Sequence, residues 1–352
     1  MKFYNLLIFI IIIFLKTGNV LSENTIFSVN NIIIKSGKHR NHQEFLDQAY
    51  REGFYRLIER ISLRKDYKKL KQTNLKEIRN LISHFQIQKI NNQNLIQRSV
   101  NIYFDKERIN KFFFNNNLTY SDFISKKITI LPIHYTDNDI KIFSNNYFYN
   151  NWTKEENEIS NSIKILNYIL PIENLELIKM INQSNKNYEN LKIDEILLDY
   201  GNQDKALIHI NFTNNKSKIF LQTFISGKKI NKSFTIDNFG NINKENFYDI
   251  IIKKSKQEIE DIIKKENILD LRTPIFLKIN FKIKEESDLK FFQNAIGQIS
   301  VVENYEVSQI SSKNTQIKIK FYGNLMKFQK LLESNGIELN IKDNEWSGKR
   351  RL

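Results

Sequence analysis

The sequence contains no cysteine and very little proline, glycine or alanine. Without cysteine, a disulfide scaffold, a zinc site built on thiolates and a lipid anchor on a cysteine are excluded. With only 10 glycines in 352 residues, loops that bring the backbone close to phosphate groups are poorly supported. The hydrophobic content of 41% and the charged content of 26% are those of a globular chain, and they exclude a disordered or collagen-like protein.

Positive charge is abundant, with a formal net charge of +15. A basic protein attracts nucleic acid or anionic lipid through long-range electrostatics. However, isoleucine, asparagine and lysine account for 147 of the 352 residues, and all three have A/T-rich codons. We therefore attribute most of the excess lysine to A/T-rich base composition, and we expect these side chains to form a solvated surface. Nucleic acid is accordingly not an expected partner.

The amino terminus has the features of an export signal. Lys2 precedes ten uncharged apolar residues, Leu6 to Leu15, and compact residues follow up to Ser22. Ten apolar residues suit the core of a signal peptide, because spanning a bilayer takes about twenty. The sequence predicts a signal peptide over residues 1–22, cleaved after Ser22, and a periplasmic mature protein. The alternative is an uncleaved signal that anchors the chain in the inner membrane.

Hydrophobic periodicity predicts an N-terminal α/β domain over residues 23–126. A strand is expected near residues 27–34, a long helix over 43–63, and two strands near 84–90 and 96–104. Apolar residues recur in the long helix at three- and four-residue steps, which is typical of a stripe facing a core. Asp105 then has the position of an N-cap for a further helix.

The middle segment, residues 127–267, has the pattern of a mixed sheet covered by helices. Two apolar strands, 128–133 and 166–172, both end in Ile-Leu-Pro-Ile. This places Pro132 and Pro171 at strand ends, where a missing amide N–H does least harm. A helix near 174–182, an alternating strand at 206–212, a hairpin turn at Ser226-Gly227 and a helix capped by Asn243 follow.

Residues 272–347 predict a third domain. Strands are expected near 275–283, 301–310, 315–321 and 337–341, with helices capped by Ser287 and opening near Asn324. This is the βαββαβ order of a ferredoxin-like domain, and residues 348–352 follow it as a basic tail. Four lysines should share the open face of its sheet: Lys278, Lys282, Lys318 and Lys320. The predicted fold class is therefore α/β (α+β), with mixed sheets covered by helices and a C-terminal ferredoxin-like βαββαβ domain.

Four stretches of the sequence carry a resemblance to a known family: residues 45–61, 98–105, 128–152 and 168–176. In order, these stretches match four motifs of that family. The first is an opening helix rich in small and apolar residues, and the second is an Arg-Tyr-x-x-x-Leu-x-Val-x-Phe strand. The third is a Leu-x-Leu-Pro-Val strand followed by an aromatic loop and Trp, and the fourth is a Val-Pro-x-Gly-Asp-Leu-x-Asp segment. In these motifs the chain resembles a bacterial envelope family called domain of unknown function twenty sixty-six. Here Glu173-Asn174 replaces the family's Gly-Asp pair, and Tyr147-Phe148-Tyr149 replaces much of its tryptophan-rich loop.

The resemblance implies an envelope location and this architecture, but it implies no reaction. The middle segment is also similar in element order to the amino-terminal domain of TolB and related outer-membrane accessory proteins. That second similarity concerns the fold alone and implies no activity.

The sequence offers candidate interaction residues but no candidate catalytic, cofactor-binding or metal-binding residue. The His-Glu-x-x-His, Gly-x-Ser-x-Gly and Walker motifs are absent from the sequence. Eight of the 11 arginines fall between Arg40 and Arg108, and Arg56 and Arg60 lie one helical turn apart. Arginine makes planar, bidentate contacts to carboxylate or phosphate. The alternative is pairing inside the domain with Glu52, Glu59 or Asp66.

Three function hypotheses from different classes remain open. The leading one is an exported, non-enzymatic accessory factor that binds another envelope protein. The second is a periplasmic small-ligand binder or enzyme with a site at the carboxyl ends of the middle sheet, near His134, Trp152 and Glu173, where open α/β sheets place their crevices. The third is binding of anionic lipid through the arginine-rich first domain, with an affinity that falls steeply with salt.

Overall fold

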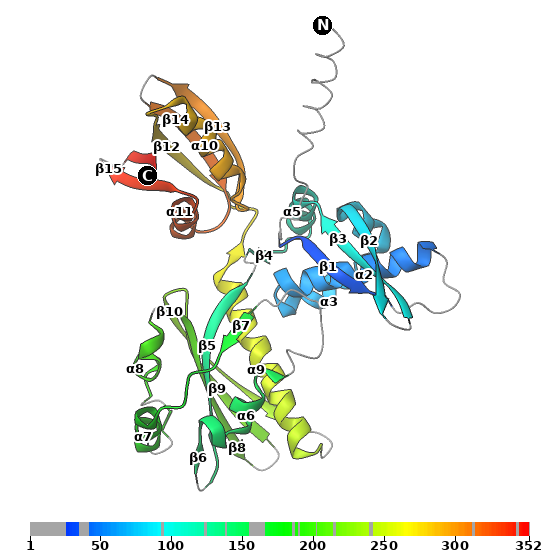
Figure 1. The fold of residues 1–352 in the computed structure, drawn as a ribbon, viewed down its shortest axis with the longest axis vertical. Helices are drawn as coiled ribbons and strands as arrows, with labels where there is room; N and C mark the ends of the chain where they lie inside the picture. The colour runs from blue at the N-terminus through cyan, green and yellow to red at the C-terminus, as the bar shows by residue number, and fades with distance from the viewer. Residues whose placement is uncertain are drawn as a thin grey trace.

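In the computed structural model of this protein, the described residues are 26–34, 42–92, 95–122, 125–137, 139–154, 166–184, 187–188, 191–201, 203–213, 216–238, 242–311, 314–342 and 345–351. They form a mixed α/β protein with four sheets, which confirms the predicted fold class (Figure 1). The predicted signal peptide, residues 1–22, lies outside the described residues. Within them, no helix has the length and apolar character needed to cross a bilayer.

The first unit is an antiparallel sheet with the long helix α2 (His42–Ile61) packed against it. The strand order is β1 (Ser28–Ile33), β3 (Leu95–Phe104), β2 (Ile82–Asn92). A Cβ atom at Gly53 would lie 2.6 Å from Ile102 Cδ1, so the helix and β3 approach each other closely at this glycine. Helices α3 (Tyr67–Leu70), α4 (Leu75–Leu81) and α5 (Lys106–Asn115) complete the unit. Asp105 caps α5 as predicted, because its carboxylate accepts a hydrogen bond from the Arg108 N–H at 2.9 Å.

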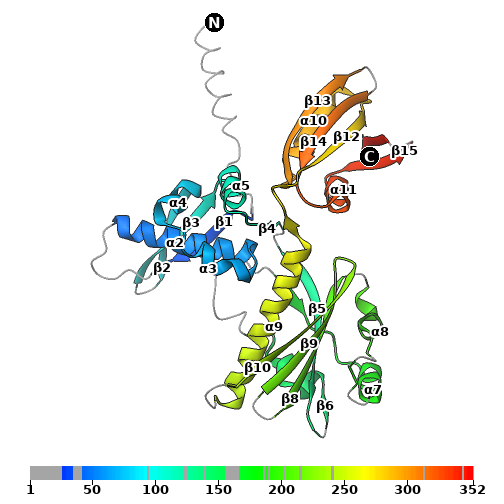
Figure 2. The same cartoon turned by 180° about the vertical axis from the view of Figure 1, so that it is seen from behind.

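The middle unit is a mixed sheet with helices on both faces (Figure 2). Its order is β10 (Lys228–Asp237), β9 (Lys216–Ile225), β8 (Asp204–Thr213), β5 (Lys126–Tyr135), β6 (Ile140–Lys141), and β7 (Leu166–Ile169) also pairs with β5. Strand β5 is parallel to β7 and β8. Helices α6 (Tyr147–Asn151) and α9 (Lys244–Glu266) cover one face, and α7 (Leu175–Gln183) and α8 (Ile193–Ile196) cover the other.

Pro132 lies inside β5, and the prediction that it ends the strand is wrong. Its carbonyl oxygen accepts a hydrogen bond from Asn146 Nδ2 at 2.8 Å. The N–H and C=O positions of one strand residue point to the same side, so the proline nitrogen also faces Asn146. On that side β7 pairs with β5 only as far as Thr129, and the pairing of β5 with β6 begins at His134. The missing N–H therefore falls in the gap between two short strands and disrupts no described ladder.

The third unit contains the predicted βαββαβ order but adds a strand. The sheet runs β13 (Val302–Ile310), β14 (Asn314–Phe321), β12 (Ile275–Lys282), β16 (Glu345–Arg350), β15 (Ile337–Lys342), with α10 (Glu286–Gly297) and α11 (Leu325–Ser334). Residues 348–350, expected in a basic tail, belong to β16, which pairs in parallel with β12. Gly348 permits this, because a Cβ there would lie 3.0 Å from Ile279 and 3.2 Å from Phe281. Helix α10 is capped by Glu285 instead of Ser287, through a capping box with Asp288.

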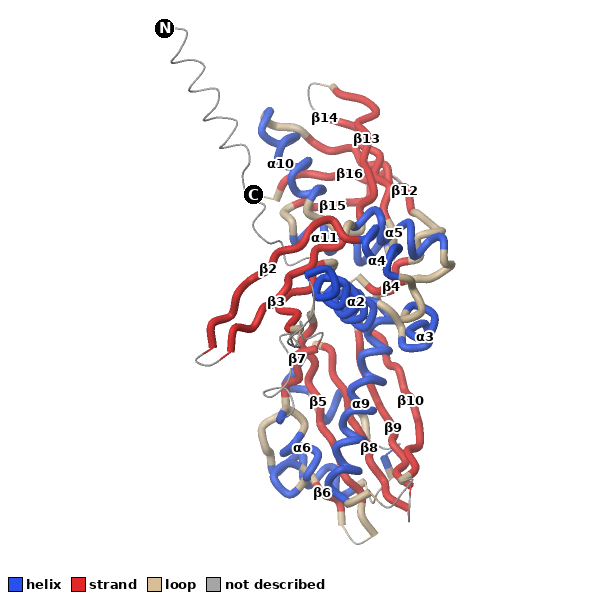
Figure 3. Tube along the Cα trace, turned by 90° about the vertical axis from the view of Figure 1, so that its right-hand side faces the viewer, coloured by secondary structure: helices blue, strands red, loops and turns tan. Residues whose placement is uncertain are grey.

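Two short strands join the three units. The chain passes through β4 (Tyr120–Ser121) before the middle unit and through β11 (Ile268–Leu269) after it, and these two strands pair antiparallel. Lys327 of α11 ties this junction by donating to Asp122 O at 2.8 Å and to Asn267 Oδ1 at 3.2 Å. The apolar core of the first unit continues through the junction into the third unit, and both units lie toward the same end of α9 (Figure 3). The middle unit is thus an insertion into a body formed by the two ends of the chain.

Candidate functional site

A cavity of about 470 Å³ lies between the first unit and α9 of the middle unit. It is lined by Val29, Asn30, Arg56, Glu59, Arg60, Arg64, Tyr67, Lys253, Gln257 and Glu260. We call it the arginine cavity, because three of its four cations are arginines. The arginines follow at four-residue steps in α2 and in the short 3₁₀ turn after it, so they rise along one side of the helix.

Arg60 is a buried cation that has no carboxylate partner among the described residues. Only 6% of its surface is exposed. Its Nη1 donates to the backbone carbonyls of Ile26 at 3.0 Å and Ser28 at 2.8 Å, which fixes the start of β1. Its Nε and Nη2 have no hydrogen-bond partner within the described residues. Burial lowers the pKa of Arg60 to about 10, so the side chain still carries its charge at neutral pH.

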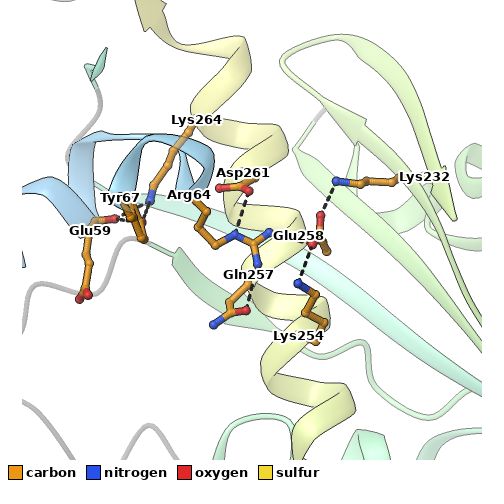
Figure 4. A network of polar contacts seen from close by, with 9 residues as sticks. All are labelled: Glu59, Arg64, Tyr67, Lys232, Lys254, Gln257, Glu258, Asp261 and Lys264. Atoms are coloured by element: carbon orange, nitrogen blue, oxygen red, sulfur yellow. Dashed lines mark hydrogen bonds and ion pairs between the residues drawn. The ribbon is translucent and has the colours of Figure 1, made fainter. Parts of the chain in front are cut away.

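Arg64, one turn further on, is fully engaged by α9 (Figure 4). Its Nε contacts Asp261 Oδ2 at 2.8 Å, its Nη2 contacts Glu258 Oε1 at 2.9 Å, and its Nη1 donates to Gln257 Oε1 at 2.9 Å. Burial acts to lower the pKa of Arg64, but the two carboxylates outweigh it and raise that pKa. These contacts span 193 or more positions of the sequence and hold the first unit against α9.

Glu258 is the centre of a cluster of cations on the inner side of α9. Besides Arg64, it pairs with Lys232 of β10 and with Lys254 at 3.4 Å (Figure 4). Burial acts to raise the pKa of Glu258, and the pairing with Lys232 and Arg64 lowers it overall. A buried carboxylate with several partners is strongly destabilised if they are removed, so this cluster also fixes α9 to its own sheet.

Lys264 forms a second contact between α9 and the first unit. Its ammonium group donates to Glu59 O and, at 3.2 Å, to the Tyr67 hydroxyl, which in turn donates to Glu59 O at 2.8 Å (Figure 4). Burial lowers the pKa of Lys264, and it raises the pKa of Tyr67 above the usual range. These three groups therefore tie α9 to the first unit at the wall of the arginine cavity.

The outer part of the cavity is less constrained. Arg56 pairs with Glu52 at 2.8 Å, as the alternative interpretation of the arginines predicted, and Lys253 is exposed. Glu260 is half-buried, and burial raises its pKa in spite of the nearby cations Lys264 and Arg64.

The structure does not gather His134, Trp152 and Glu173 into one site. Trp152 is fully buried in the core under α9, with the Lys256 ammonium group 6.0 Å from its ring. Glu173 is exposed in the loop after β7, where its charge contributes to the raised pKa of Tyr149 behind the larger effect of burial.

His134, by contrast, lines a second cavity, of about 360 Å³, which we call the histidine cavity. The cavity lies where β5 and β8 end, beside the first turns of α9. Its lining consists of His134, Tyr135, Thr136, Asp137, Lys141, Phe212, Asn238, Ile242, Lys244, Phe247 and Tyr248. His134 therefore lines a hollow at the predicted end of the sheet, whereas Trp152 and Glu173, predicted to lie near it, do not line this cavity.

The open sheet face of the third unit carries the four predicted lysines. Lys278 lies directly opposite Lys318, so the strand register puts two cations side by side. Lys320 pairs with Glu303 at 2.8 Å and lies 5.9 Å from the ring of the exposed Phe276. The face is mixed in charge, which favours a solvated surface. Across the described part of the chain, no group of His, Asp and Glu side chains is arranged to hold a metal ion.

Sequence reasoning missed Lys253, Gln257 and Glu260, the α9 side of the arginine cavity. Their spacing is a local signal, because positions 253, 257 and 260 follow at helical steps opposite the apolar stripe of α9. The pairing of that polar face with Arg64 is not a local property, since it joins residues about two hundred positions apart.

Comparisons with protein-family models, with curated proteins and with solved structures find no match to this chain.

Proposed function

We propose that this protein is a non-enzymatic binding protein that holds an anionic group, a phosphate or a carboxylate, in the arginine cavity. The observation that carries the proposal is Arg60: a guanidinium group that keeps its charge, is 6% exposed and has no carboxylate partner among the described residues. Burying a charge without a counter-charge costs several kcal/mol. An anion in the adjoining cavity would offset that cost.

The donors around Arg60 suit such a ligand. A guanidinium group presents its N–H donors in a planar fork that matches phosphate and carboxylate oxygens. Arg56 and the exposed Lys253 add charge at the outer part of the cavity. Arg64, saturated by Glu258 and Asp261, contributes to the potential without being needed as a donor.

The geometry favours a single anionic group over a flat membrane surface. Three arginines of the first unit that do not serve as donors to the anion are taken up by carboxylates: Arg64 by α9, Arg79 by Asp47 and Arg108 by Asp105. Those pairs reduce the cationic surface that anionic lipids would contact. A free phosphate and a phosphate headgroup share the same chemistry, however, so the test distinguishes the two sources.

The test is stabilisation by inorganic phosphate. We expect phosphate, compared with chloride at equal ionic strength, to raise the free energy of unfolding of the full chain by about 1.4 kcal/mol at ten times its Kd. The double variant Arg56→Gln with Lys253→Gln should lose most of this gain. Vesicles of phosphatidylglycerol and vesicles of phosphatidylcholine form the second arm, in a sedimentation assay.

Lys179→Gln is the matched control for one of the two substitutions, because Lys179 is an exposed lysine of α7 outside the cavity. It should leave the phosphate effect unchanged. The proposal is rejected if phosphate gives no more stabilisation than chloride, or if the double variant keeps the full effect. Binding to anionic vesicles without any effect of free phosphate would assign the site to a lipid surface instead.

The proposal keeps the predicted envelope role, which rests on the leader at residues 1–22 and on the resemblance to the envelope family. One surface supports a protein partner: Ile172, Leu175 and Leu198, at the start of α7 and in the adjoining turn, are 83%, 74% and 71% exposed. Exposed apolar groups of this kind mark interaction surfaces when they are contiguous. Crosslinking in intact cells should capture an envelope protein on a chain that begins at Glu23. Recovery of an uncleaved chain from the cytosol would contradict the export proposal.

A further inference from the structure

The histidine cavity is a second concave site, separate from the arginine cavity of the proposed function. It lies at the carboxyl ends of the parallel strands β5 and β8, and α9 closes one side. Open α/β sheets place ligands at this position because the helices and loops that follow the strands leave a crevice there. Its volume of about 360 Å³ is that of a site for a small molecule.

The floor of the cavity is an aromatic cage around an imidazole ring. His134 is 5% exposed, and its ring makes edge contacts with Phe148, Phe212 and Tyr248 at centroid distances of 5.3, 5.1 and 5.8 Å. Neither ring nitrogen of His134 has a hydrogen-bond partner within the described residues. A buried polar group is normally hydrogen-bonded, so the ring is left with one donor and one acceptor for a molecule in the cavity.

The imidazole is held in its neutral form. Burial, with smaller contributions from the charges of Lys141 and Lys244, lowers the pKa of His134 to about 4. At neutral pH the ring therefore offers a hydrogen-bond donor and an acceptor, and no charge. Flat aromatic walls beside such a ring suit a planar ligand.

Two cations lie at the rim of the same cavity. Lys141 is in β6, and Lys244 is the first residue of α9, with its ammonium group 5.6 Å from the ring of Tyr248. Asp137 also lines the rim and is already engaged in an interaction of its own. Two lysines beside one carboxylate leave the rim positive, so it favours an anionic substituent on the ligand.

We propose that the histidine cavity binds a small planar ring that bears a carboxylate or phosphate group. The ring lies among Phe212, Phe247 and Tyr248 with an edge on His134, and the anionic group faces Lys141 and Lys244. The ligand makes these contacts without the arginine cavity, so the two sites bind independently.

The experiment compares three probes by isothermal titration calorimetry with the full chain: benzoate, benzamide and cyclohexanecarboxylate. Benzamide lacks the charge, and cyclohexanecarboxylate lacks the planar ring. We expect benzoate to bind about fivefold more tightly than either of them. Lys244→Gln should weaken benzoate about threefold, because one partly exposed charge contact is lost. Lys244 is exposed, so this variant should fold normally.

Two further variants make the result decisive. His134→Phe keeps the aromatic cage and removes the ring nitrogens. It should leave benzoate affinity within about twofold, because benzoate has no polar atom on its ring, but it should weaken nicotinate about fivefold, because the pyridine nitrogen then loses a hydrogen bond from the imidazole. Lys253→Gln belongs to the arginine cavity and should leave benzoate affinity unchanged. Equal binding of the three probes overturns the proposal, as does benzoate affinity that Lys244→Gln leaves unchanged or nicotinate affinity that His134→Phe leaves unchanged. Loss of benzoate binding in Lys253→Gln would also overturn it, because the carboxylate would then be in the arginine cavity.

Discussion

The arginine cavity and the histidine cavity are both built around a basic side chain that is buried, yet the two side chains end with different charges. Burial lowers the pKa of Arg60 from 12.5 to about 10 and that of His134 from 6.5 to about 4. Arg60 therefore stays protonated at neutral pH, whereas His134 is neutral. The intrinsic pKa of the side chain, and not the degree of burial, decides which kind of site results.

The difference also appears in the partners of each group. One nitrogen of Arg60 donates to two backbone carbonyls, that of Ile26 just before β1 and that of Ser28 in β1, and Arg60 has no counter-ion among the described residues. His134 has three aromatic rings around it and no hydrogen bond within the same set of residues. The retained charge of Arg60 favours an anionic ligand. The neutral ring of His134, whose nitrogens have no partner among the described residues, favours a ligand that donates and accepts hydrogen bonds. This contrast gives predictions of graded size.

The largest expected effect comes from Arg60→Met. The substitution removes two hydrogen bonds from a charged group to buried carbonyls, each worth roughly 1.5–3 kcal/mol, and the relief of the buried charge offsets part of the loss. We expect the free energy of unfolding to fall by about 2–4 kcal/mol. Urea denaturation followed by circular dichroism measures this change.

His134→Phe is the counterpart in the other cavity. It breaks no hydrogen bond of the ring within the described residues and keeps an aromatic group in the cage. At pH 7.5 it should therefore change stability by less than about 1 kcal/mol. If Arg60→Met is neutral and His134→Phe is severely destabilising, the contrast between the two cavities does not hold.

The second prediction concerns acid pH. His134 and the fully buried His209 both have a pKa of about 4 in the folded chain, with burial as the main cause. As the pH falls from about 6.5 toward 4, the unfolded chain takes up protons that the folded chain does not. Stability is therefore lost over this window, by roughly 1–2 kcal/mol per histidine at pH 5 relative to pH 7.5.

The control for the pH effect lies in the variants. His134→Phe should remove about half of the loss between pH 7.5 and pH 5, and the remainder belongs largely to His209. Arg60 does not titrate in this window, so Arg60→Lys should leave the slope unchanged. A stability profile that is flat from pH 7.5 to pH 5 in the wild-type chain would contradict the neutral state of both histidines.

Much of the fold could be predicted because its signals are local. The stripe of α2, the caps Asp105 and Asn243, and the turn at Ser226-Gly227, where both residues have positive φ, all follow from short-range patterns. Strand β16 was missed because its inward face consists of Trp346 and Gly348, which gives no apolar alternation to detect.

The candidate sites show where sequence reasoning stops. The spacing of Arg56 and Arg60 correctly placed them on one side of a helix, and the topology rule correctly placed His134 at a crevice. Whether an arginine is saturated or left without a counter-charge depends on α9, which is about two hundred residues away. The insertion of the middle unit through β4 and β11 has no local signature either, because it rests on the pairing of Tyr120-Ser121 with Ile268-Leu269.

The smallest expected effect comes from Glu52→Gln at the outer part of the arginine cavity. Glu52 and Arg56 form an i,i+4 pair with side-chain exposures of 41% and 23%, and such pairs contribute roughly 0.3–0.5 kcal/mol. Stability should therefore change by less than about 0.5 kcal/mol, close to the limit of measurement.

The same substitution removes a competing carboxylate from Arg56 and adds one net positive charge beside the cavity. Phosphate should consequently bind about twofold more tightly, while benzoate affinity at the histidine cavity should not change. Glu176→Gln in α7 makes the same charge change at an exposed position outside both cavities. If that control tightens phosphate binding equally, the gain reflects overall charge, and Arg56 is not a donor to the anion.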